Sequence, residues 1–218
     1  MMDDMPNTAA KELSAVDLAY NGIIDLVLRR ELRPGERTSV YLLVDRLQIG
    51  RTPVREAINR LQSEGFLSVA GRSGTVVNPI DQAQARQLFA LRLTLESFAA
   101  DYAVQNVTDA DLQKLKRAVD KLGEAGSSAD FVRANTEFHS SIVALAANPM
   151  LIRFYAQLQI QLHVVIYLAE RGADPAAATA RHQEHLDIFA ALAKRDAEAL
   201  KAALQRHIRT TERAVLGK

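Results

Sequence analysis

The feature that most constrains the fold of this chain is a change in its pattern of apolar residues at Pro79. Before Pro79, stripes with helical three-to-four spacing give way to two short apolar runs around a Gly-rich turn, which favours two strands. After Pro79, the apolar residues keep helical spacing with no convincing strand signal. Because each part carries its own apolar faces, the sequence predicts two domains with different folds.

Residues 14–78 have the pattern of a winged helix-turn-helix. A first helix is expected from Ser14, a short second one from Ser39, and a third over about 52–64. The two apolar runs around the Gly-rich turn then supply a two-stranded wing.

Residues 80–215 are predicted to form an all-helical domain. Its helices are expected at 81–105, 108–124, 129–147, 149–171, 175–194 and 196–215. Short links between them favour an antiparallel bundle. The expected fold class is therefore mainly α, with an N-terminal winged helix-turn-helix and a C-terminal antiparallel six-helix bundle.

Composition narrows the classes of function. The chain has no Cys, which excludes disulfide scaffolds, thiolate zinc sites and cysteine nucleophiles. No apolar run approaches the roughly 18 residues that a membrane span needs. Residues 1–13 are polar and lack the basic-then-apolar order of a signal peptide, so we expect a disordered arm on a cytoplasmic protein with no membrane partner.

Charge is distributed unevenly along the chain. The formal net charge is only +1, but residues 29–78 hold nine Arg and no Lys against five acidic residues, a local balance of +4. Arg51, Thr52 and Arg55 begin the third helix, whose N-terminal end reaches base edges in a helix-turn-helix. Arg51 and Arg55 share a face off the apolar stripe, so they can address guanine or phosphate; two solvated arginines are the alternative. Arg72, at the tip of the wing, is a candidate phosphate or minor-groove contact.

Four polar residues of the C-terminal domain can converge. Asn135 and His139 are four residues apart and share a helix face. His185 and His207 each lie about 11 residues from the turn near 195–196, which places them side by side in an antiparallel hairpin. Three imidazoles and an amide oxygen inside a bundle suit Zn, Ni, Co or Fe(II). Separate structural histidines are the alternative.

The other histidines are weaker candidates. His182 is expected to be an ordinary surface or hydrogen-bonded residue, and His163 a candidate wall of a ligand cavity. Three His with an open position would also suit a hydrolytic metalloenzyme. Glu137 is the nearest carboxylate in sequence, but it points away from His139 around the helix, so no general base is evident.

The segments 33–37 and 50–61 resemble the GntR family of transcription regulators, and 64–67 and 74–77 continue the match. The resemblance implies that Arg37 also contacts double-stranded operator DNA. The family usually has Gly and a hydroxyl residue where this chain has Gln48 and Gly50, so one phosphate contact and one helix cap are expected to be missing.

Residues 80–215 are similar to the C-terminal ligand-binding (FCD) domain of the FadR branch, in its six-helix VanR-like division. The resemblance implies a divalent transition metal, with zinc or nickel expected, on Asn135, His139, His185 and His207. It also implies that Arg92 faces the effector, although an intrahelical ion pair with Glu96 is an equal alternative.

Together these features predict a homodimeric regulator, by default a repressor, whose operator affinity changes when a small carboxylate metabolite binds the C-terminal cavity. Two alternatives remain at this point. One is a His-cluster metalloenzyme, and the other is the same regulator with histidines that bind the effector without a metal.

Overall fold

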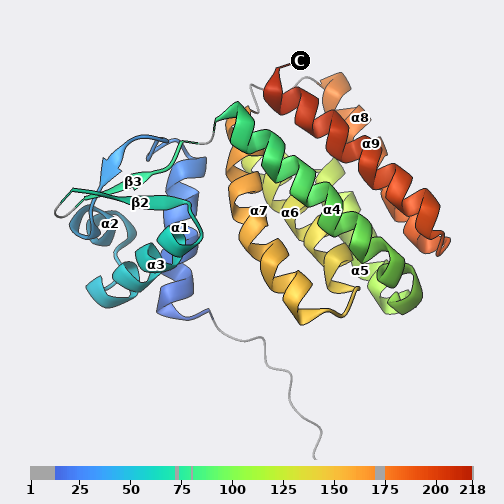
Figure 1. The fold of residues 1–218 in the computed structure, drawn as a ribbon, viewed down its shortest axis with the longest axis horizontal. Helices are drawn as coiled ribbons and strands as arrows, with labels where there is room; N and C mark the ends of the chain where they lie inside the picture. Colours follow the sequence, from blue (N-terminus) through green and yellow to red (C-terminus); the bar gives the residue numbers. More distant parts are fainter. Residues whose placement is uncertain (1–12, 72–73, 80, 170–174, 218) are drawn as a thin grey trace, which may run out of the picture. The chain divides into compact units, whose positions relative to one another are not determined.

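The computed structural model describes residues 13–71, 74–79, 81–169 and 175–217. The chain divides into two compact units, Met1–Asn78 and Pro79–Lys218 (Figure 1). Of the predicted disordered arm, only Leu13 lies within the described residues, so that expectation stays a prediction.

The first unit combines three helices with a small sheet. Its elements are α1 (Ala15–Leu28), β1 (Arg37–Thr38), α2 (Val40–Leu47), α3 (Arg51–Ser63), β2 (Leu67–Ala70) and β3 (Gly74–Val77). Ser14 begins α1 in a capping box with Asp17, and the Ser39 hydroxyl accepts a hydrogen bond from the Leu42 N–H, so both predicted caps are present. The sheet order is β1-β3-β2, and β1 is a strand that the sequence did not predict.

A polar cluster joins α1 to α3 beside their apolar contact. The Tyr20 hydroxyl donates to Glu64 at 2.6 Å, and the Arg60 guanidinium lies 4.0 Å from the centre of the Tyr20 ring. Arg60 also forms ion pairs with Asp17 and Glu64, each at 3.2 Å. Arg60 therefore stabilises the packing of α1 against α3, although it counts toward the positive charge of residues 29–78.

The second unit is all-helical over its described residues. Its helices are α4 (Gln82–Asn106), α5 (Asp109–Gly123), α6 (Ser128–Ala144), α7 (Pro149–Ala169), α8 (Pro175–Ala193) and α9 (Ala197–Leu216). All six predicted helices are found. The predicted end at 171 lies outside the described residues, and the other ends differ from the predicted ones by at most three residues. The fold class is mainly α, as predicted.

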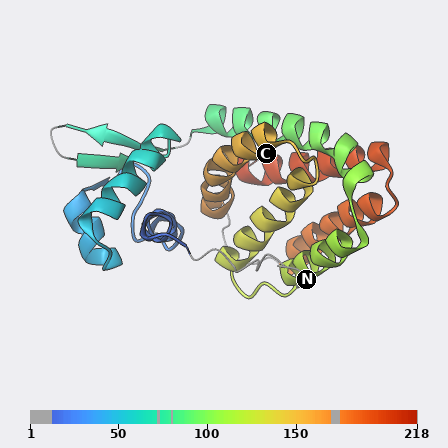
Figure 2. The same ribbon diagram turned by 90° about the horizontal axis from the view of Figure 1, so that it is seen from below.

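Helix α4 runs along one side of this unit and packs against α6, α7 and α9 (Figure 2). Its C-terminal end is closed by Arg195 from the α8–α9 turn, which donates to the carbonyls of Val104 and Val107 at 3.1 and 2.6 Å. The bundle core is apolar except for a set of buried polar residues shared by α4, α6, α7, α8 and α9. No helix within the described ranges has the length and apolar character required to cross a membrane.

Candidate functional site

The N-terminal end of α3 is rich in exposed donors. Val54, Ala57 and Ile58 bury one face of the helix, whereas Arg51, Thr52 and Arg55 are exposed. None of these three exposed side chains bonds to another residue in the part of the chain that the structure describes. Their donors are therefore available to DNA.

The start of α3 lacks a side-chain cap, as expected from the absence of the hydroxyl residue that the family usually has there. Gly50 is the N-cap, and no side chain caps the helix. Arg37 is exposed on β1, where it pairs with Val76 of β3. Arg72 lies outside the described residues, so its proposed DNA contact stays a prediction.

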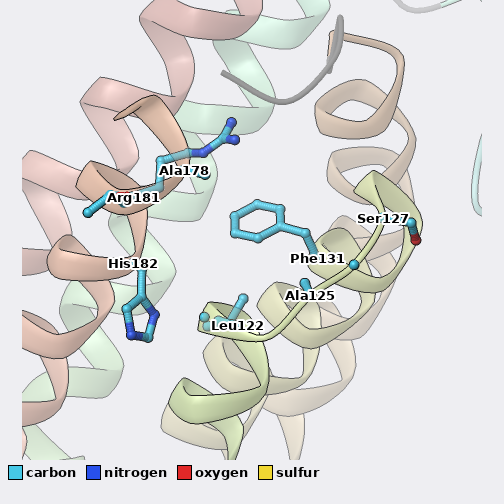
Figure 3. Close-up of a pocket in the computed structure, with 10 residues that line it drawn as sticks. Leu122, Ala125, Ser127, Phe131, Ala178, Arg181 and His182 are labelled. Carbon is cyan, nitrogen blue, oxygen red and sulfur yellow. The ribbon is translucent and has the colours of Figure 1, made fainter. Parts of the chain in front are cut away.

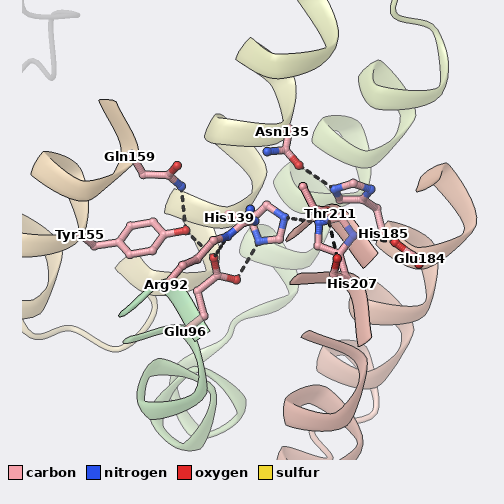
Figure 4. A network of polar contacts seen from close by, with 10 residues as sticks. All are labelled: Arg92, Glu96, Asn135, His139, Tyr155, Gln159, Glu184, His185, His207 and Thr211. Carbon is pink, nitrogen blue, oxygen red and sulfur yellow. Dashed lines mark hydrogen bonds and ion pairs between the residues drawn. The ribbon is translucent and has the colours of Figure 1, made fainter. Parts of the chain in front are cut away.

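Three histidines meet in the core of the second unit (Figure 4). His139 of α6, His185 of α8 and His207 of α9 are all buried, and their ligand atoms lie within 4.8 Å of one another. The Nε2 atoms of His139 and His207 are 3.2 Å apart, and Nε2 of His185 is 2.9 Å from Oδ1 of Asn135. The structure thus brings together the four residues that the sequence suggested as ligands.

The Nδ1 atom of each imidazole, which faces away from the centre of the cluster, has its own hydrogen-bond acceptor. Nδ1 of His139 donates to Glu96 at 2.8 Å, and Nδ1 of His207 donates to Glu184 at 2.9 Å. Nδ1 of His185 donates to the backbone carbonyl of Arg181 at 2.7 Å. Since carboxylates and carbonyls only accept, each Nδ1 carries the proton and each Nε2 presents a lone pair to the cluster.

Burial lowers the pKa of all three histidines. The Arg92 charge lowers the pKa of His139 further, and the neighbouring imidazoles do the same for His185 and His207. The rings are therefore neutral at pH 7, and their inward lone pairs repel one another unless a cation lies between them.

The cluster fits a transition-metal ion. Bonds of about 2.0–2.1 Å at tetrahedral or octahedral angles place neighbouring ligand atoms about 2.8–3.4 Å apart. The two closest pairs, at 3.2 and 2.9 Å, lie in this range. Imidazole nitrogen, an amide oxygen and outer acceptors that fix each ring form a donor set suited to zinc or nickel.

Glu96 connects the cluster to a second buried polar group. Its Oε1 accepts from Arg92 Nε at 2.7 Å and from the Tyr155 hydroxyl at 2.5 Å, while its Oε2 accepts from His139. Burial alone would raise the pKa of Glu96, but Arg92, His139 and Tyr155 outweigh it and hold the pKa below its ordinary range. Glu96 is therefore a buried carboxylate that stays ionised.

Arg92 forms the intrahelical ion pair with Glu96 that the sequence allowed as an alternative to effector binding. Its side chain is fully buried, yet neither Nη1 nor Nη2 has a hydrogen-bond partner among the described residues. Unpaired buried donors of this kind are costly, and a bound anion or water would satisfy them.

The remaining histidines do not belong to the three-histidine cluster. His163 is half-buried, with Nδ1 at 3.3 Å from the Thr136 hydroxyl oxygen. His182 packs against Gly123. Glu137 is exposed, as expected, and lies 3.9 Å from the Lys121 ammonium.

Sequence reasoning missed two acceptors that orient the cluster. The sequence indicates Glu96 only as a partner of Arg92, because no spacing rule relates position 96 to His139. Glu184 had a usable signal, because the hairpin register that pairs His185 with His207 also brings position 184 beside that ring. Both carboxylates face Nδ1 atoms, so neither stands on the Nε2 side as a free general base.

Comparison with known proteins identifies both units. Residues 16–77 match the gntR family of bacterial regulatory proteins, and residues 87–210 match the FCD domain. The Nta operon transcriptional regulator of Aminobacter aminovorans is 30% identical over 178 residues, covering 81% of this chain and 82% of that protein. The HTH-type transcriptional repressor RspR of Escherichia coli is 27% identical over 197 residues, covering 87% and 86%.

A solved structure agrees with this assignment. Escherichia coli McbR/YncC aligns with a TM-score of 0.81 and 26% identity, over 91% of this chain and 95% of that one. The matched families and these relatives are transcription regulators rather than enzymes, so the metalloenzyme alternative is not supported. The chain is a DNA-binding regulator of the GntR family, in the FadR branch whose C-terminal domain is an FCD domain.

Proposed function

We propose that this regulator is a repressor whose operator affinity falls when a small carboxylate binds its metal-containing FCD domain. The observation that carries the proposal is that one buried core holds both unpaired acceptor nitrogens and unpaired donor nitrogens. Inward lone pairs of three neutral imidazoles call for a cation, and the free nitrogens of Arg92 call for an anion. A repressor role is supported by the name of the relative RspR.

The metal would be held by Asn135, His139, His185 and His207, with zinc or nickel as the expected ion. When bound, it would supply a positive charge that attracts a carboxylate. Arg92 would donate its free Nη hydrogens to the same ligand, and His163 would form a wall of the cavity. Asn135 brings no charge, so we expect weaker metal binding than with Asp at that position.

Operator binding would be dimeric. Arg51, Thr52 and Arg55 would enter the major groove, with Arg37 and Arg72 on the backbone or minor groove.

On α4, three large apolar side chains, Leu91, Phe98 and Tyr102, are 44–48% exposed at helical spacing. This apolar face supports a homodimer formed through the second unit.

The test is metal content followed by thermal melting. Protein purified without a His-tag is analysed for metal, stripped, and melted with and without zinc or nickel. Zinc at 100 times its Kd would stabilise the fold by about 2.7 kcal/mol, because the four ligands are assembled only in the folded bundle. His185→Ala and His207→Ala should each remove this gain.

His182→Ala is the matched control, because His182 lies on the same helix as His185 without joining the cluster. It should keep the full response to zinc. Melting that ignores every divalent ion would contradict the metal site. In that case, stabilisation by small carboxylates without metal would favour direct binding by the histidines.

A further inference from the structure

A pocket of about 240 Å³ opens between the α5–α6 loop and α8 (Figure 3). Its polar wall includes Ser127, Thr179, Arg181 and His182, and the Phe131 ring projects between the two sides. A side-chain carbon at position 123 would lie 2.8 Å from the His182 ring, so Gly123 lets the imidazole pack directly against the backbone here. A positive charge and hydroxyls beside an aromatic face suit a small carboxylate.

This pocket lies one side-chain layer from the histidine cluster. Phe131 is one turn before Asn135 on α6, and Arg181 is one turn before His185 on α8. The Phe131 ring stands edge-on to the His185 ring with centroids 6.2 Å apart. The backbone carbonyl of Arg181 accepts the Nδ1 hydrogen of His185.

Phe131 and Arg181 also contact each other. The Arg181 guanidinium lies 4.9 Å from the centre of the Phe131 ring, a cation–π contact. The pair therefore bridges α6 and α8 between the pocket and the cluster.

We infer that this pocket is the vestibule through which small carboxylates reach the metal cluster, with the Phe131–Arg181 pair as the partition. The inference rests on the metal site proposed above. It assigns a role to the α5–α6 loop and to the first turns of α8, which carry none of the four ligands.

The experiment measures how fast the small dianion pyridine-2,6-dicarboxylate removes zinc from the loaded full-length protein. Phe131→Ala opens the partition and should accelerate removal by about tenfold, as expected for loss of a gate. Ala178 is exposed and lines the pocket, so Ala178→Phe should obstruct the vestibule and slow removal severalfold. Ala180→Phe is the matched control, since Ala180 is exposed on the same helix and is not part of the pocket lining.

The outcomes separate the inference from the proposed function. Equal rates for Ala178→Phe and Ala180→Phe would overturn the vestibule. Acceleration by Phe131→Ala without slowing by Ala178→Phe would also overturn it, because the ring would then only stabilise the cluster. A wild-type protein that takes up no zinc would instead refute the metal site itself, and the route with it.

Discussion

Replacing Glu96 with Gln tests the central polar connection of the FCD domain. The substitution keeps the shape of the side chain and removes one buried negative charge. Arg92 then loses its ion-pair partner while remaining fully buried. Removing one partner of a buried ion pair costs about 3–5 kcal/mol, because the other charge is left uncompensated.

The same change should also weaken metal binding. An amide at position 96 has one acceptor oxygen and one donor nitrogen, whereas Glu96 accepts from Arg92, Tyr155 and His139 together. If the amide nitrogen faces His139, the proton of that ring must move to Nε2, which removes the inward lone pair. Loss of such an outer partner lowers metal affinity by about 10–100-fold.

Urea unfolding of the metal-free protein, monitored by the helical circular dichroism signal, measures the loss of stability. A competition titration with zinc measures the loss of metal affinity. Glu137→Gln is the matched control, because Glu137 is exposed and should change neither quantity. The double variant Arg92→Met with Glu96→Gln should recover much of the stability but not the zinc affinity. A Glu96→Gln protein within 1 kcal/mol of the wild type would refute the buried ion pair.

Three further outcomes follow from the described contacts. Arg51→Ala and Arg55→Ala should each weaken operator binding by about 1–3 kcal/mol at fixed salt, as measured by titration with operator DNA. Arg60→Ala should chiefly lower the stability of the first unit, as measured by urea unfolding. Gln48→Gly should stabilise the first unit to urea by about 1 kcal/mol, because Gln48 ends α2 in the left-handed region at φ 55°. A fragment of residues 80–218 should fold and sediment as a dimer; a micromolar monomer would contradict an interface in the second unit.

The helices could be predicted because their apolar residues repeat with the helical period and their ends carry caps. Ser14 and Ser39 are capping residues in the structure, as the sequence indicated. Strand β1 could not be predicted, because it has only two residues and is created by pairing with β3, which is distant in sequence. A two-residue strand has no period of its own to detect.

The members of the cluster could be predicted where they share one helix or one helical hairpin, because the sequence spacing then fixes how close they lie. His185 and His207 are equidistant from a short turn, so local geometry alone sets them together. The contact of Glu96 with His139 joins α4 to α6, and no short-range rule relates those two positions. The pocket beside Phe131 depends in the same way on how a loop packs against α8.

Glu96 also explains how a metal and an anion could act together in one domain. One of its oxygens holds Arg92, and the other holds the Nδ1 hydrogen of His139. A cation on His139 would strengthen that ring as a hydrogen-bond donor to Glu96, which would weaken the bond from Glu96 to Arg92. An anion at the free nitrogens of Arg92 would compensate for that loss, so each ligand favours the other. By linkage, the factor by which metal raises carboxylate affinity must equal the factor by which carboxylate raises metal affinity. The buried ion pair thus supplies a physical path for coupling that neither site has alone.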